Sequence, residues 1–140
     1  MAKGQWVFDP DSGGVKIPDH KKTVVKQRIE SFAAEHYAGK YTRLELRFRG
    51  QFCYIDAYTE PSVPDVWPHE DWGETREEMM ERLRNTPVHL CRLRYFGDDD
   101  WGFAFYTYSN EKYTLSVFPD GDFFGVPEDA FAASALYLEG

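Results

Sequence analysis

The strongest constraint on the fold is a strict alternation of apolar and charged residues in the segment 41–49. From Arg43 onward every second residue is apolar and the residues between are charged: Leu44, Leu46 and Phe48 alternate with Arg43, Glu45, Arg47 and Arg49. Because successive side chains of a β-strand point to opposite faces, this pattern indicates a strand that is buried on one face only. Gly50 and Gln51 suit a two-residue type II′ turn, so we expect segment 52–58 to return as the antiparallel partner. A turn at Arg49 and Gly50 is the alternative, which shifts the pairing by two residues and leaves the faces unchanged.

Further strands are expected in the second half of the chain. The apolar and aromatic segments 88–96, 101–108 and 112–118 are bounded by turn residues, and Phe123 and Phe124 predict a short sixth strand. The turn at 97–100 makes 88–96 and 101–108 an antiparallel pair. We therefore predict a mostly antiparallel sheet of five to six strands.

Three helices are predicted. Apolar residues recur at three- and four-residue spacing through 19–38, and Gly39 suits the position after a helix. Thr75 and Glu78 form a capping-box pattern at the start of a helix over 75–85. Pro127 fits the first position of a final helix.

These elements define an α+β fold in a single domain that spans 1–140. The strands come in antiparallel runs interrupted by helices, so the helices are expected mainly on one face of the sheet. The N-terminal residues 5–17 are expected to form a β-hairpin-like arm, and the proline-rich segment 60–74 an irregular loop.

Charge and hydrophobicity restrict the class of protein. The 24 acidic residues outnumber the 16 basic residues, and the formal net charge of −8 opposes a general attraction to nucleic acid or to anionic lipid. No apolar segment has the roughly 18–20 residues of a membrane helix and no signal peptide is evident, so a cytoplasmic location is expected. Cys53 and Cys91 lie in apolar strands and are expected to be buried thiols, with a disulfide between neighbouring strands as the alternative.

The sheet face that the helices leave uncovered is the candidate binding surface. The expected register places Phe96 opposite Trp101, and therefore Arg94 opposite Phe103 and Arg92 opposite Phe105. The predicted surface comprises arginine and aromatic residues: Arg43, Arg47, Arg49, Phe52, Tyr54, Tyr58, Arg92, Arg94, Phe103 and Phe105. The covered face then holds His89, Cys91, Leu93, Ala104, Tyr106, Tyr108, Tyr113, Leu115 and Val117.

Arginine and aromatic residues in this arrangement allow three interpretations. Guanidinium groups stack on rings, so the arginines could simply shield the sheet. The same residue types are enriched at protein interfaces, and they also form stacking platforms for single-stranded nucleic acid. We expect a non-enzymatic protein-interaction module, with self-association into a homodimer as one version and nucleic-acid binding as an alternative.

Catalysis is the alternative from a different class. His69 and Glu70 in the loop 60–74, together with Asp56 at the end of the second strand, could supply an acid–base pair for a small hydrolase-like or ligand-binding enzyme. The four histidines lack helical metal-ligand spacing, and no phosphate-binding glycine motif or dinucleotide fingerprint is present. We therefore expect neither a metal nor a cofactor.

Overall fold

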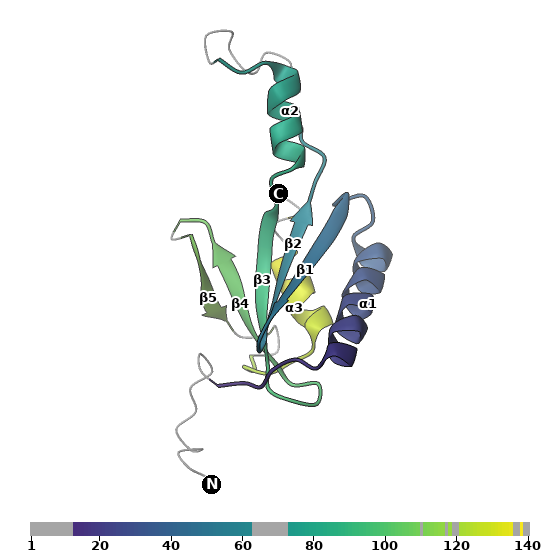
Figure 1. The fold of residues 1–140 in the computed structure, drawn as a ribbon, viewed down its shortest axis with the longest axis vertical. Coiled ribbons are helices and arrows are strands. Elements are labelled where there is room, and N and C mark those ends of the chain that lie inside the picture. The colour runs from purple at the N-terminus through teal and green to yellow at the C-terminus, as the bar shows by residue number, and fades with distance from the viewer. Residues whose placement is uncertain are drawn as a thin grey trace.

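The computed structural model describes residues 13–62, 73–109, 111–116, 118, 121–135 and 138 (Figure 1). The predicted α+β class is confirmed: the described chain forms a five-stranded antiparallel sheet with three helices. None of the helices in this part of the chain is both long and apolar enough to cross a membrane.

The five strands follow one another across the sheet in chain order. They are β1 (Arg43–Arg49), β2 (Phe52–Tyr58), β3 (Val88–Tyr95), β4 (Trp101–Thr107) and β5 (Lys112–Ser116). Each strand pairs antiparallel with the next, which gives the order β1-β2-β3-β4-β5. The sheet is therefore a simple meander, interrupted only between β2 and β3, where a helix is inserted.

The β1–β2 hairpin has the predicted two-residue turn. Arg49 pairs with Phe52 and Arg43 with Tyr58, which excludes the alternative turn at Arg49 and Gly50. Gly50 has a φ of 61°, as the first central residue of a type II′ turn requires. This register places the charged residues of β1 and the aromatic residues of β2 on the same face.

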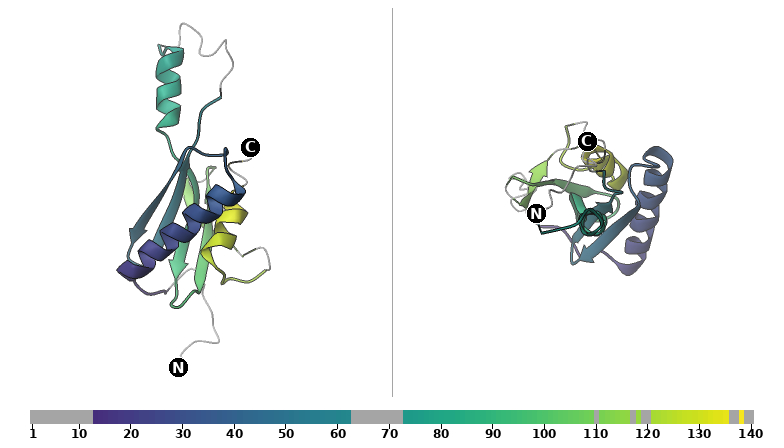
Figure 2. Two further views of the ribbon diagram at one scale, coloured as in Figure 1. Left: turned by 90° about the vertical axis from the view of Figure 1, so that its right-hand side faces the viewer. Right: turned by 90° about the horizontal axis from the view of Figure 1, so that it is seen from above.

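Two helices cover one face of the sheet (Figure 2). They are α1 (Asp19–His36) and α3 (Pro127–Ser134), which contact each other as well as the strands. Val25, Ile29 and Ala33 of α1 are buried, and Pro127 occupies the first turn of α3 as predicted. We call the covered face the inner face and the opposite one the outer face.

The third helix, α2 (Arg76–Arg84), projects from the end of the sheet at which β2 ends and β3 begins (Figure 1). Its predicted capping box is present: the Thr75 side chain accepts a hydrogen bond from the Glu78 backbone, and the Glu78 carboxylate accepts one from the Thr75 backbone. No described helix packs on the outer face of the sheet.

The core lies between the inner face and the two helices. Leu44, Leu46 and Phe48 contribute from β1, as their alternation predicts, and pack against fully buried residues of the middle strands. The largest side chains are Trp101, Phe103 and Phe131, each almost completely inaccessible. The burial of these apolar side chains decides which face of the sheet packs against the helices.

The expected register between β3 and β4 is wrong by one residue. Trp101 pairs with Tyr95 and not with Phe96, because Gly97 and Asp98 both adopt positive φ and the connection is one residue longer. A one-residue shift moves every β4 side chain to the other face. The large apolar residues Trp101 and Phe103 are thereby buried, and small residues, Gly102 and Ala104, face outward.

Two other expectations differ from the structure or lie outside it. Phe123 and Phe124 do not form a strand: within 121–125 only Gly125 makes a bridge, to Trp101. Most of the predicted arm 5–17 and most of the loop 60–74 lie outside the described residues. The described end of the arm crosses the hairpin ends, where Val15 N–H donates to the Tyr95 carbonyl and Ile17 N–H to the Gly50 carbonyl.

Arg28 joins three separate parts of the fold. Its guanidinium donates two hydrogen bonds to Glu128 of α3, at 2.7 and 2.8 Å, and two to Asp99 in the β3–β4 connection, at 2.7 and 3.1 Å. Burial alone would raise the pKa of Asp99, but hydrogen bonds from Arg28 and Trp101 outweigh it and hold the pKa below its ordinary value. The cluster therefore ties α1 to both of its neighbours.

We predict that Arg28→Ala lowers the free energy of unfolding by about 1–2 kcal/mol, measured by urea denaturation, because it removes charge-assisted hydrogen bonds in a half-buried site. Arg84→Ala is the matched control, because Arg84 also pairs with a carboxylate, that of Glu60, but this pair is exposed to solvent. The control substitution should therefore change the free energy of unfolding little. The Asp99 contribution is present above the ordinary carboxyl pKa of about 3.9 and is lost as pH falls through the lower folded-state pKa. An Arg28→Ala deficit no larger than that of Arg84→Ala would contradict the role of the cluster.

Cys53 and Cys91 are buried free thiols, as expected, and the alternative disulfide is absent. Burial raises the pKa of Cys91 to about 12, although a hydrogen bond with Ser134 partly offsets this effect. Burial also raises the pKa of Cys53 well above its ordinary range. Both thiols therefore remain protonated and enclosed.

We predict that neither cysteine reacts appreciably with a disulfide reagent in the native protein at mildly alkaline pH. The raised pKa of Cys91 alone lowers its thiolate fraction by roughly three orders of magnitude relative to a thiol of pKa about 8.5. Both should react rapidly in denaturant, with thiol release followed by absorbance. Rapid labelling of either thiol in the native state would show that the core opens readily at these strands.

Candidate functional site

The outer face brings together most of the predicted binding surface. The pairings of β1 with β2 and of β2 with β3 place eight of the ten residues on it: Arg43, Arg47, Arg49, Phe52, Tyr54, Tyr58, Arg92 and Arg94. They come from three adjacent strands. The alternation in the sequence therefore located a continuous arginine and aromatic surface.

Guanidinium groups on this face lie over aromatic rings. Arg43 lies 3.7 Å from the centre of the Tyr58 ring and Arg47 lies 5.2 Å from that of Tyr54. Arg92 and Arg94 both lie over Phe52, at 4.7 and 4.8 Å. These are cation–π distances, and they order the rings and the arginines together.

Phe103 and Phe105 do not belong to this surface, so their predicted position is wrong. Phe103 pairs with Leu93 and Phe105 with Cys91, and both lie on the inner face. The cause is the longer β3–β4 connection. The sequence held a signal for it, because Trp101, Phe103 and Phe105 alternate with the small residues Gly102 and Ala104.

Three of the residues that we expected on the inner face, all with ring side chains, lie instead on the outer face. The shifted register carries Tyr106 outward, and Tyr113 follows because it pairs with Tyr106. A bulge in the β2–β3 pairing also brings His89 opposite Asp56, with Leu90 as the extra residue. No residue pattern marks this bulge, so simple alternation placed His89 on the wrong face.

The shifted register explains the remaining face assignments too. Ala104 and Leu115 pair with each other on the outer face, contrary to expectation, whereas Cys91 and Leu93 lie on the inner face as expected. Tyr108 is exposed, and its hydroxyl accepts a hydrogen bond from the His89 backbone at 2.7 Å. Val117 lies outside the described residues.

A buried carboxylate organises the centre of the outer face. Asp56 is only 2% exposed. One of its oxygens accepts a hydrogen bond from Arg47 Nη2 at 3.0 Å, and the other lies 2.8 Å from His89 Nδ1. Because a carboxylate can only accept, Nδ1 carries the hydrogen, and Nε2 is the ring nitrogen left to meet a ligand. Asp56 therefore fixes both side chains, Arg47 and His89, in place.

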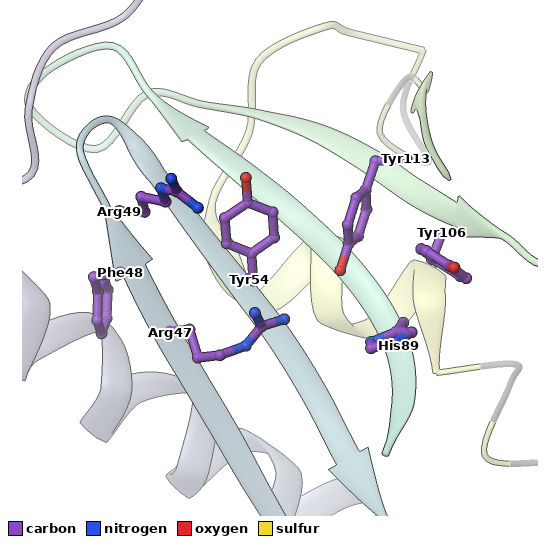
Figure 3. Close-up of a pocket in the computed structure, with 7 residues that line it drawn as sticks. All are labelled: Arg47, Phe48, Arg49, Tyr54, His89, Tyr106 and Tyr113. Atoms are coloured by element: carbon purple, nitrogen blue, oxygen red, sulfur yellow. The ribbon is translucent and has the colours of Figure 1, made fainter. Parts of the chain in front are cut away.

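A hollow of about 500 Å³ lies over this group (Figure 3). Its lining residues are Arg47, Phe48, Arg49, Tyr54, His89, Tyr106 and Tyr113. The side chain of Phe48 is turned toward α1, whereas the other six lie on the outer face. The hollow is thus surrounded by residues from all five strands.

Hydrogen-bond donors dominate the lining of the hollow. Burial, followed by the negative charge of Asp56, raises the pKa of the Tyr113 phenol well above its ordinary range, so it stays protonated. Figure 3 shows its hydroxyl directed toward the space between Arg47 and His89. The guanidinium N–H and phenol O–H groups together suit an anionic ligand.

Of the three residues considered for catalysis, the structure describes only Asp56. His69 and Glu70 lie outside the described residues, and Asp56 is held by Arg47 and His89. The Asp56–His89 pair has the form of an oriented base, but the described lining of the hollow contains no serine, threonine or cysteine for it to activate. No group of histidine, cysteine and acidic residues suited to a metal occurs in the described ranges.

Comparison of the chain with models of protein families, with curated proteins and with solved structures finds no match in any of the three.

We predict that Asp56→Asn lowers the free energy of unfolding by about 1–3 kcal/mol, because it leaves Arg47 and His89 without their common anionic partner. Glu45→Gln is the matched control: Glu45 pairs with Asp56 across the strands but accepts only a hydrogen bond from the Tyr58 hydroxyl at 3.2 Å. Thermal and urea unfolding of both variants provide the measurement. Equal losses for the two variants would show that Asp56 does not organise this face.

Proposed function

We propose that this chain is a non-enzymatic interaction module whose outer sheet face binds an acidic segment of a partner protein. The observation that carries the proposal is the charge of this face. It bears five arginines (Arg43, Arg47, Arg49, Arg92 and Arg94) and two acidic residues (Glu45 and Asp56), whereas the whole chain has a net charge of −8. A local excess of positive charge on an acidic protein favours an acidic partner over any other.

The aromatic content of the face supports a protein ligand. Arginine and tyrosine are enriched among the residues that dominate protein binding energy, because they combine apolar area with hydrogen bonding. Arg47 and Arg49 are exposed, and Tyr54 and Tyr113 are half-buried beside the hollow. The face therefore offers apolar contact and charged donors together.

The ring geometry favours a protein over single-stranded nucleic acid. Base stacking needs a free ring face, but Tyr58, Tyr54 and Phe52 each have a guanidinium over one face. Neighbouring rings also meet steeply, at 61° for Tyr54 with Tyr113 and at 73° for Tyr106 with Tyr113. These rings do not form a row of parallel platforms.

The positive charge of the outer face argues against the homodimer that we considered from the sequence. A two-fold dimer through the outer face would place the same five arginines of two copies against one another. Such a contact costs free energy unless anions intervene, because like charges are brought together. The arrangement is better suited to a different chain that supplies carboxylates.

We predict that the protein binds a peptide of alternating glutamate and tyrosine residues more tightly than a matched lysine and tyrosine peptide, and that added salt weakens binding. Arg49→Glu should weaken the acidic peptide at least about tenfold, since it replaces an attraction by a repulsion. Isothermal titration calorimetry measures the affinities. Arg49 suits this test because it is exposed, unlike Arg94, which is nearly buried and donates to the Gly13 carbonyl at 2.9 Å.

Lys26→Glu is the matched control, because Lys26 is exposed on α1 and α1 covers the opposite face. It makes the same change of charge and should alter affinity less than twofold. Equal effects of the two variants, or tighter binding of a thymidine oligonucleotide than of the acidic peptide, would contradict the proposal. A dimer by light scattering that Arg49→Glu dissociates would instead establish self-association through this face.

A further inference from the structure

We infer that the hollow in the outer face receives a phosphorylated tyrosine side chain of the partner. This inference rests on the proposed function and specifies its ligand. The site is the hollow lined by Arg47, Arg49, Tyr54, His89, Tyr106 and Tyr113. Its donors, its charge and its aromatic walls each favour a phosphate on an aromatic ring over a simple carboxylate.

The donors reach the hollow from several directions. Arg47 and Arg49 come from β1, Tyr54 from β2, His89 from β3 and Tyr113 from β5. A carboxylate has two oxygens in one plane, whereas a phosphate ester presents three strong acceptor oxygens arranged around phosphorus. Donors that surround a space match the second geometry better.

Local charge also favours a strongly charged anion. Asp56 neutralises Arg47, one of the two arginines that line the hollow, and it occupies His89 Nδ1, which leaves Nε2 as the ring nitrogen available to a ligand. Two arginines and one carboxylate leave an excess of one positive charge. A phosphate monoester, with a charge of about −1.5 to −2 near neutral pH, attracts these donors more strongly than a carboxylate does.

Glu45 does not alter this balance. It lies on the outer face beside Asp56 but outside the lining of the hollow, and its carboxylate accepts the Tyr58 hydroxyl. No described acidic residue lines the hollow, and the nearby Asp56 is already bound to Arg47 and His89.

Aromatic walls supply a place for the ring that bears the phosphate. Tyr113 lies between Tyr54 and Tyr106, with ring centres 5.4 and 5.1 Å away, and His89 lies 4.6 Å from Tyr106. Offset and edge contacts of this kind stabilise a further aromatic ring. A volume of about 500 Å³ is within the range of small-molecule sites and exceeds what a lone phosphate needs.

The test compares small probes in calorimetry and in amide chemical-shift titrations. We expect phenyl phosphate to bind at least about tenfold more tightly than benzoate and than inorganic phosphate, with the largest shifts at Arg49, Tyr54 and Tyr113. Phenyl sulfate, which has the same shape and one charge fewer, should bind more weakly than phenyl phosphate. Equal affinity of phenyl phosphate and benzoate, or no binding of phenyl phosphate, would overturn the inference.

Two variants probe the donors without disturbing Asp56. Tyr113→Phe removes only the phenol hydroxyl and should weaken phenyl phosphate about tenfold, the effect of one hydrogen bond to a charged group. Tyr58→Phe is the matched control on the same face but outside the hollow, and it should leave the affinity unchanged. Arg49→Gln should also weaken binding, and unchanged affinity in both Tyr113→Phe and Arg49→Gln would place the phosphate elsewhere.

A pair of peptides separates this inference from the proposed function. The alternating glutamate and tyrosine peptide tests the face as a whole, and the same peptide with one phosphorylated tyrosine tests the hollow. If Arg49→Glu weakens the unmodified peptide but phosphorylation adds no affinity, the interaction module stands and the phosphotyrosine site fails. If neither peptide binds, the interaction module and the phosphotyrosine site both fail. If phosphorylation increases affinity about tenfold and Tyr113→Phe cancels that increase, both proposals are supported.

Discussion

Every feature of the candidate site depends on the burial of one set of alternating residues beneath α1 and α3. A β-strand side chain can lie on only two sides, and Leu46, Ile55 and Leu93 occupy the side that the helices cover. The residues between them must then lie on the outer face. The arginines are thus gathered there because the apolar residues are withdrawn from water, and the site is a consequence of core formation.

Arginines that lie close together on one sheet face repel one another unless their positive charge is compensated. The structure compensates this charge in three ways. Aromatic rings lie beneath the guanidinium groups, Asp56 holds Arg47 and His89 by direct contacts, and Gly13 accepts a hydrogen bond from Arg94. The compensation is incomplete at Arg47 and Arg49, which remain exposed beside the hollow. This residual positive charge connects the fold to the proposed acidic, phosphorylated partner.

The same residues that stabilise the fold could thus also bind the partner. Asp56 is predicted to stabilise the outer face and, in the proposed site, it also holds His89 beside the ligand, so its role in folding and its role in binding must be separated by experiment. Tyr113 and Arg49 are better probes, because neither touches Asp56 in a direct hydrogen bond and both line the hollow. The Arg28 cluster joins the two helices and lies apart from the outer face.

By itself the sequence determined the α+β class, the three helices, the five main strands and the arginine and aromatic character of β1 and β2. These follow from local patterns, namely alternation, helical spacing and turn residues, which need no knowledge of distant contacts. Only the tertiary structure decided the faces of His89, Tyr106 and Tyr113, because a bulge at Leu90 and one extra residue in the β3–β4 connection each reverse the alternation. Such single-residue shifts are set by which register buries Trp101 and Phe103 against the helices. This packing energy is shared among several elements, and the large and small residues that alternate in segment 101–105 record only a part of it.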